Sequence, residues 1–187
     1  MRLFISINCN DETKSHLLYV QEKIKSQAIS GNFTRPENLH MTLIFLGEIK
    51  GADIPLICSI IKNATRQQEL SSNLILSKAD CFKHFNRELW WVGADSSDPF
   101  LYILRGIRQK IANGLSEKNI FFDNKQFKPH ITLGREIKHD KPIVIPEQKI
   151  NFPVKRISLM KSERIKGILA YTEIFGVNLE EVTKNDV

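Results

Sequence analysis

The sequence lacks the features that mark several large classes of protein. Its three cysteines are odd in number and far apart, so they fit neither a zinc or redox motif nor a disulfide framework, and we expect buried free thiols. No stretch approaches the roughly 18 consecutive apolar residues that a membrane span requires. Asn8 and Asn10 end the apolar N-terminal run too early for a signal peptide. We therefore expect a cytoplasmic protein with no membrane contact.

Low-complexity segments and linkers rich in glycine or serine are also absent from the sequence. The 187 residues are 42% hydrophobic and 26% charged, which suits one domain with a core of its own. We expect this domain to cover residues 1–180 and a polar tail to fray over residues 181–187. The 27 Lys and Arg residues outnumber the 21 Asp and Glu residues, and the net charge of +6 favours an anionic partner such as nucleic acid.

Apolar periodicity predicts strands and helices in two comparable halves. In each half we expect a helix, a strand that carries a histidine, and a hairpin, so the halves should be lobes that share one core. The predicted helices begin after Asn10 or Asp11, cover residues 54–66, and follow an Asp98 cap to about Ser116. Further strands are predicted over 3–9, 74–76, 89–92, 154–160 and 170–177, with a hairpin loop over 82–87 and a polar connection over 161–167.

Two similar tetrads stand out in predicted strands. His40-Met41-Thr42-Leu43 recurs in kind ninety residues later as His130-Ile131-Thr132-Leu133. Because side chains alternate faces along a strand, the histidine and threonine of each tetrad point the same way. The bare pattern is short, but its context adds specificity, since turn chemistry precedes both copies and a glycine follows each.

The residue types in the tetrads suit chemistry at phosphorus. Two imidazoles supply a general base and a general acid, because the reference pKa of histidine, about 6.5, allows either role near neutral pH. Two hydroxyl groups can hold phosphate oxygens during an in-line displacement. If the two strands face one cleft, the sequence predicts an enzyme that acts on a phosphate ester.

Three blocks of sequence resemble a known family. They are Arg2–Ile5, Arg35–Leu43 continued by Phe45–Glu48, and Phe127–Arg135, with a weaker match over Ile157–Ser162 and at Tyr171. On these blocks the chain resembles the two-histidine (2H) phosphoesterase superfamily. Within that superfamily it is most similar to the RNA 2′,3′-cyclic phosphodiesterases, also called 2′-5′ RNA ligases.

The resemblance implies an α+β fold with two lobes related by a pseudo-two-fold axis, each an antiparallel sheet backed by helices, and a central cleft. It implies hydrolysis of a terminal 2′,3′-cyclic phosphate to a 2′-phosphate with neither metal nor other cofactor. His130 would be the base that takes a proton from water, and His40 the acid that protonates the departing ribose 3′-oxygen. Thr42 and Thr132 would hold the non-bridging oxygens, and Arg135 would add positive charge. The implied partner is RNA or a nucleotide ending in a 2′,3′-cyclic phosphate, bound by a monomer.

One position departs from the family pattern. Members often carry Lys or Arg two residues after the first threonine, and this chain has Ile44 there. A phosphate or RNA contact at this position is therefore in doubt. Other basic residues could replace it, although each is more simply read as a solvated surface charge: Arg35, Lys125, Lys128, Lys161 and Arg164.

Three alternatives stay open from the sequence. The same residues could catalyse the reverse reaction, which is RNA ligation through a 2′-5′ linkage. The scaffold could instead be a non-catalytic module that binds RNA or nucleotides. A metallohydrolase would use the histidines as ligands, but its acidic partners at short spacing are missing, and insensitivity to chelators would exclude it.

Overall fold

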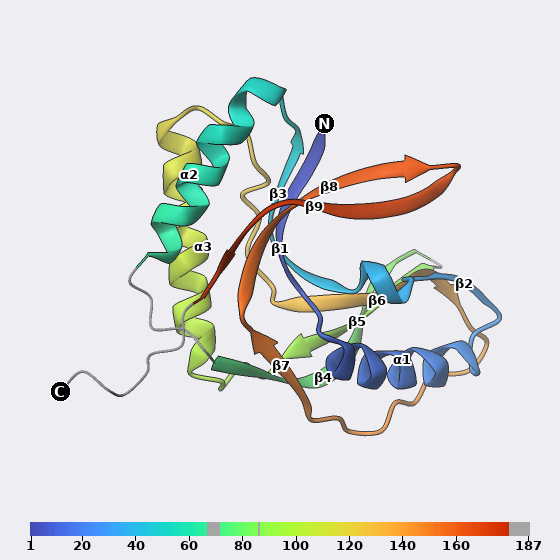
Figure 1. The fold of residues 1–187 in the computed structure, drawn as a ribbon. Coiled ribbons are helices and arrows are strands. Elements are labelled where there is room, and N and C mark those ends of the chain that lie inside the picture. Colours follow the sequence, from blue (N-terminus) through green and yellow to red (C-terminus); the bar gives the residue numbers. More distant parts are fainter. Residues whose placement is uncertain (67–71, 86, 180–187) are drawn as a thin grey trace.

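The computed structural model describes residues 1–66, 72–85 and 87–179 (Figure 1). The predicted tail over 181–187 lies outside this part of the chain. The helices are α1 (Asp11–Lys25), α2 (Ile54–Thr65) and α3 (Phe100–Glu117), with short 3₁₀ turns η1 (Pro36–Asn38) and η2 (Gly51–Asp53). The strands are β1 (Arg2–Asn8), β2 (Ser30–Phe33), β3 (His40–Glu48), β4 (Ser72–His84), β5 (Arg87–Ala94), β6 (His130–Lys138), β7 (Ile150–Val154), β8 (Arg156–Ile165) and β9 (Ile168–Asn178).

The strands form one curled antiparallel sheet, which confirms the α+β class. Their order is β7-β4-β5-β6-β3-β1-β8-β9, and β2 also pairs with β6. The two tetrad strands, β3 and β6, are central neighbours, and the register between them is the single pair Met41↔Ile131. The two expected sheets are therefore joined at the point where the tetrads meet.

The lobes do not follow the two halves of the sequence, and this part of the prediction is wrong. α1 packs on β6 and β7, whereas α2 packs against α3 and β9. Figure 1 shows α2 and α3 side by side and α1 in a separate layer. The C-terminal hairpin β8–β9 pairs with β1, the first strand of the chain. Each lobe therefore contains segments from both ends of the sequence.

The helix starts agree with their predicted caps. The Asn10 side chain accepts a hydrogen bond from the Thr13 amide at 2.9 Å and caps α1. At α3 the Asp98 carboxylate accepts one from the Phe100 amide at 2.9 Å, although the helix begins one residue later than expected, with Pro99 as its N-cap. The cysteines are free as expected, but only Cys9 is buried, and burial raises its pKa to about 12. None of the helices in the described ranges is both long and apolar enough to cross a membrane.

Two segments that we expect to be loops are mostly strand. The expected connection over 161–167 is strand: β8 and β9 pair as far as Ile165↔Ile168, and only Lys166 and Gly167, both at positive φ, form the turn. Most of the expected loop over 82–87 is also strand, because β4 and β5 pair as far as His84↔Arg87. In each hairpin the two strands hydrogen-bond to one another, which satisfies their backbone groups. Such strands need little alternation of apolar and polar residues.

The predicted strand over 154–160 is two strands with different partners. β7 pairs with β4 at the edge of the sheet, where Pro153 is tolerated, and β8 pairs with β1. Strand β2, over residues 30–33, was not expected, because its four residues are mostly exposed and have no apolar pattern. Short edge strands of this kind leave almost no signal in a sequence.

Candidate active site

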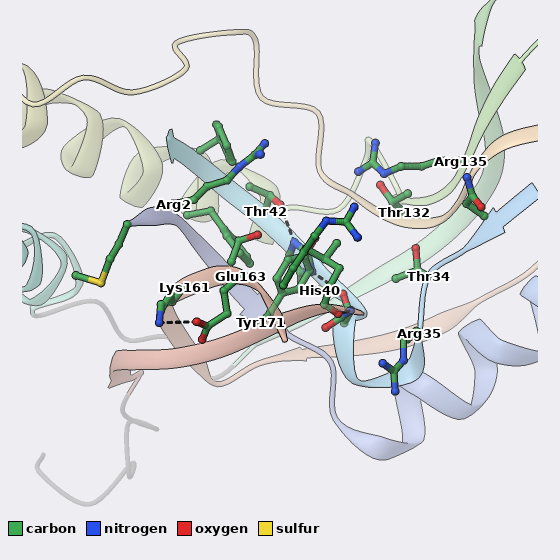
Figure 2. A pocket seen from close by; sticks show the side chains of 18 of the residues that line it. Arg2, Thr34, Arg35, His40, Thr42, Thr132, Arg135, Lys161, Glu163 and Tyr171 are labelled. Atoms are coloured by element: carbon green, nitrogen blue, oxygen red, sulfur yellow. Dashed lines mark hydrogen bonds and ion pairs between the residues drawn. The ribbon is translucent and has the colours of Figure 1, made fainter. Parts of the chain in front are cut away.

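A cleft of about 930 Å³ lies where β3 and β6 meet. All five residues that the sequence predicts as a site line it: His40, Thr42, His130, Thr132 and Arg135. Figure 2 shows Thr42 and Thr132 on facing strands, with His40 between them and Arg135 beyond Thr132. Because β3 and β6 are antiparallel and Met41 pairs with Ile131, the register sets His40 beside Thr132 and Thr42 beside His130. Each histidine thus has a hydroxyl group from the opposite strand next to it.

An equivalent hydrogen bond to a backbone carbonyl orients each imidazole. His40 Nδ1 lies 2.7 Å from the carbonyl oxygen of Asn38, and His130 Nδ1 lies 2.6 Å from that of Lys128. Since a carbonyl only accepts, Nδ1 carries the proton in both rings, and Nε2 is the atom left for chemistry. His40 Nε2 is also 2.9 Å from Thr42 Oγ1.

Aromatic rings hold His40 in its place. Phe4 is tilted against its imidazole with the ring centroids 4.8 Å apart, and Tyr171 meets it edge-on at 5.2 Å. Phe4 is in turn edge-on to Tyr171 at 4.9 Å. Two rings, from β1 and β9, therefore fix the orientation of this side chain.

His130 has a matching aromatic neighbourhood in the other lobe. Phe82 and Trp91 both meet its imidazole edge-on, with centroid distances of 5.5 and 5.9 Å. Gly93 pairs with His130 across the strands, and a Cβ there would lie 2.5 Å from the Trp91 ring. The glycine therefore makes room for the tryptophan that packs against the histidine.

The environment favours the neutral form of both histidines. Burial is the largest cause that lowers the pKa of His40, and the positive charges of Arg135 and His130 add to it, although the hydrogen bond to Asn38 opposes the change. Burial also lowers the pKa of His130, with Arg135 and Lys128 acting in the same direction. An anion bound in the cleft opposes these effects, because it attracts the imidazolium form.

A matched bulge lies at the last residue of each tetrad and changes which side chains reach the cleft. The β1–β3 register passes from Ser6↔Thr42 to Ile5↔Ile44, and Leu43 is the extra residue. The β5–β6 register skips Leu133 in the same way, between Trp91↔Thr132 and Trp90↔Gly134.

The bulge determines where the side chain of Ile44, which departs from the family pattern, lies. Strict alternation would put Ile44 on the cleft face, but it is 1% exposed and belongs to the core. Phe45 lines the cleft in its place. Ile44 is therefore a core residue here and makes no contact with the cleft. On β6 the equivalent residue is Arg135. It follows His130 by five residues, just as Phe45 follows His40.

Two buried polar side chains that sequence reasoning missed fix the bulges. Gln21 Nε2 on α1 donates to the carbonyl oxygens of Leu133 and Thr34, both at 2.8 Å. On α3 the guanidinium of Arg108 donates to Leu43 O at 3.2 Å and to Lys125 O at 2.9 Å. A signal for them exists in the sequence. Each is a lone polar residue at the same place in an apolar helix face, in Leu17-x-x-Val20-Gln21-x-x-Ile24 and Leu104-x-x-Ile107-Arg108-x-x-Ile111.

The other basic residues named from the sequence are engaged with protein groups. Arg35 pairs with Glu37 at 2.6 Å, Lys161 with Glu163 at 2.7 Å and Lys125 with Asp123 at 3.0 Å. Lys128 lies over the Phe82 ring at 5.2 Å, and Arg164 donates to a backbone carbonyl at 2.8 Å. In residues 1–66, 72–85 and 87–179, no three His, Cys, Asp or Glu side chains gather as a metal site would require.

Comparison with known proteins relates both the sequence and the fold to one family. The family model described as LigT-like phosphoesterase matches residues 7–86. A protein of Thermotoga maritima named RNA 2′,3′-cyclic phosphodiesterase is 30% identical over 139 residues, which are 72% of this chain and 70% of that protein. A Thermus thermophilus protein of the same name is 28% identical over 166 residues, with 87% and 82% of the two chains covered.

Solved structures extend the similarity to the whole fold. A crystal structure of a Thermus thermophilus protein superposes with a TM-score of 0.79 at 26% identity and covers 96% of this chain and 98% of its own. The structure of E. coli LigT complexed with 3′-AMP has the same fold, with a TM-score of 0.70 at 22% identity over 95% and 96% of the two chains. The chain therefore belongs to the LigT-like phosphoesterases of the 2H superfamily.

Proposed function

We propose that this protein hydrolyses the terminal 2′,3′-cyclic phosphate of RNA to a 2′-phosphate without a metal ion. One observation carries the proposal: two imidazoles in one cleft are anchored through Nδ1, at 2.7 and 2.6 Å, and keep Nε2 for proton transfer. The names of the Thermotoga and Thermus relatives support the substrate. The basic composition of the chain, with a net charge of +6, suits an RNA partner.

The proposed reaction uses the two histidines in opposite protonation states. Neutral His130 takes a proton from water through Nε2 as the water oxygen bonds to phosphorus. The bond from phosphorus to the ribose 3′-oxygen breaks, and His40 gives its Nε2 proton to that oxygen. The product is a 2′-phosphomonoester, and the two imidazoles end with their protonation states exchanged. Acid and base assistance of this kind each contribute about a hundredfold or more.

Thr42, Thr132 and Arg135 form the proposed phosphate pocket. The two hydroxyl groups come from facing strands, so they can donate to different non-bridging oxygens. The exposed guanidinium of Arg135 adds a fork of N–H donors that matches phosphate oxygens better than a point charge does. Because the cleft lowers the pKa of His40, the bound phosphate anion is what keeps this histidine charged as the acid.

The test is hydrolysis of a short RNA that ends in a 2′,3′-cyclic phosphate, in EDTA, with the product resolved as 2′- or 3′-phosphate. We expect the product to be the 2′-phosphate, formed in EDTA at the same rate as without it. If EDTA abolished the activity and added metal restored it, the metallohydrolase would be favoured. Binding without turnover would favour the non-catalytic module. A 5′-hydroxyl RNA added to the same reaction measures ligation through a 2′-5′ linkage, which we expect to be minor because water is in vast excess.

A monomeric state and a cytoplasmic location stay predictions.

A further inference from the structure

Arg2 and Phe45 pack against each other at one end of the cleft. The Arg2 guanidinium carbon lies 5.1 Å from the centroid of the Phe45 ring, and both residues line the cleft. Figure 2 shows Arg2 beyond Thr42 and Arg135 beyond Thr132, so the two arginines stand at opposite ends of the proposed phosphate pocket. The mechanism above uses only one of them.

The pseudo-symmetry of the site explains why Arg2 is there. Phe45 holds on β3 the place that Arg135 holds on β6, so the first tetrad strand has a ring where the second has a cation. Arg2, on the neighbouring strand β1, places its cation over that ring. The aromatic face attracts the guanidinium and holds it in one orientation, while its N–H edge stays available to an anion.

Arg2 also forms no ion pair in the described part of the chain, although Glu48 is its cross-strand neighbour on β3. Within the described residues, neither Arg2 nor Arg135 has a carboxylate partner. The two carboxylates that line the cleft are engaged elsewhere: Glu163 pairs with Lys161 at 2.7 Å, and Glu48 lies 3.3 Å from the amine of Met1. An exposed, oriented and unpaired guanidinium is suited to bind an anionic ligand group.

This anion is not the phosphate that reacts. Arg135 already supplies the cation of the proposed phosphate pocket. Arg2 lies instead against Phe45, which holds the matching place on the opposite tetrad strand. Arg2 therefore meets a different anionic group of the ligand.

We propose that Arg2 and Phe45 form a second anion subsite, which binds the phosphate on the 5′ side of the nucleotide that carries the cyclic phosphate. The inference rests on the proposed function, because an RNA that ends in a cyclic phosphate has all its other phosphates on that side. A nucleoside 2′,3′-cyclic phosphate with a free 5′-hydroxyl leaves the subsite empty. The subsite therefore selects the ends of polynucleotides over isolated cyclic nucleosides.

The kinetic test compares cytidine 2′,3′-cyclic phosphate with and without a 5′-phosphate, for wild type and Arg2→Gln. We expect the 5′-phosphate to raise kcat/KM of wild type about tenfold, as a charge-assisted contact does, and to give Arg2→Gln no such gain. On the substrate without a 5′-phosphate, the two proteins should differ less than about twofold. Arg2→Lys should keep part of the gain. Lys110→Gln removes one exposed charge from α3 and should keep all of it.

A binding measurement separates this inference from the proposed function. Calorimetry with adenosine 2′-monophosphate and adenosine 2′,5′-bisphosphate needs no turnover, so it reports on the subsite even if the protein is not a hydrolase. We expect Arg2→Gln to weaken binding of the bisphosphate alone. Equal effects of Arg2→Gln on both ligands, or no advantage of the second phosphate in wild type, would overturn the subsite. Absence of turnover with both cyclic substrates would count against the proposed function only.

Discussion

Gln21 and Arg108 perform the same structural task in opposite lobes. Each extends from a mainly apolar helix face and donates to the carbonyl oxygen of a bulge leucine, Leu133 for Gln21 and Leu43 for Arg108. Each also donates to the segment that leads into the other tetrad, at Thr34 and Lys125. The bulge at the end of one tetrad is thereby tied to the segment that leads into the other, which fixes the two histidines relative to each other.

The Gln21 connection should be measurable as stability. Gln21→Leu keeps the size of the side chain but removes both hydrogen bonds to the buried Leu133 carbonyl and to that of Thr34. We expect the free energy of unfolding to fall by about 1–3 kcal/mol, measured by urea denaturation. Gln109→Leu on α3, where the glutamine is exposed, is the matched control and should change it by less than about 0.5 kcal/mol. Equal changes in the two variants would contradict this role.

The two lobes should unfold together. α1 comes from the start of the chain and packs on β6, while β9 from the end packs with α2, so neither lobe is a continuous stretch of the sequence. We propose a single folding domain, with one transition in urea. Far-ultraviolet circular dichroism reports all helices, and fluorescence reports Trp90 and Trp91 of β5 alone. Coincident curves are expected, and two separate midpoints would show independent lobes.

The charge of Arg135 should be visible in the titration of both histidines. Arg135 lowers the pKa of His40 and of His130, so Arg135→Gln should raise both values in NMR titrations of the free protein. Lys110→Gln, a distant change of the same charge, should leave them unaltered.

The same pKa directions predict the pH dependence of activity. In the proposed reaction the base His130 must be neutral and the acid His40 charged, so kcat/KM should fall below the pKa of His130 and above that of His40. Because both values lie under the ordinary one, the maximum of kcat/KM should lie below about pH 6.5. The two rings interact, so the limbs of the curve report the pair rather than either residue. A maximum on the alkaline side would contradict the pKa directions.

The hydrogen bond between His40 and Thr42 should separate two threonine variants. Thr42→Val removes the hydroxyl group that lies 2.9 Å from His40 Nε2, while Thr42→Ser keeps it. We expect Thr42→Val to lower kcat/KM on the cyclic phosphate by about 10- to 100-fold and Thr42→Ser by much less. Thr172→Val, on the exposed part of β9, controls for loss of a strand hydroxyl. If Thr42→Val matched Thr172→Val, the hydroxyl would have no part in the reaction.

The sequence predicted the tetrad strands, the three helices and the grouping of five polar side chains in one cleft because each depends on a local pattern. Alternation placed His40 with Thr42, and caps such as Asn10 located helix starts. The same alternation failed beyond Thr42, since a bulge is a property of two paired strands and one strand alone does not show it. That is why Ile44 was expected at the cleft and Phe45 was not.

The assignment of elements to lobes failed for a related reason. Which sheet a helix covers depends on contacts between distant segments, and the apolar face of α1 fits β6 and β7 although β1 is its neighbour in sequence. Gln21 and Arg108 were overlooked because each looks like a single polar exception in an apolar face. Their partners, two backbone carbonyls each, become apparent only once the bulges are known.

The most direct test of the central claim compares His40→Ala and His130→Ala with wild type on RNA that ends in a 2′,3′-cyclic phosphate. We predict that both variants stay folded, bind the 2′-phosphate product, and lose activity by about 100- to 10,000-fold. On a nucleotide 4-nitrophenyl phosphodiester, whose leaving group needs no proton, His40→Ala should regain activity relative to wild type while His130→Ala should not. Near-normal hydrolysis of the RNA by either variant would contradict the account.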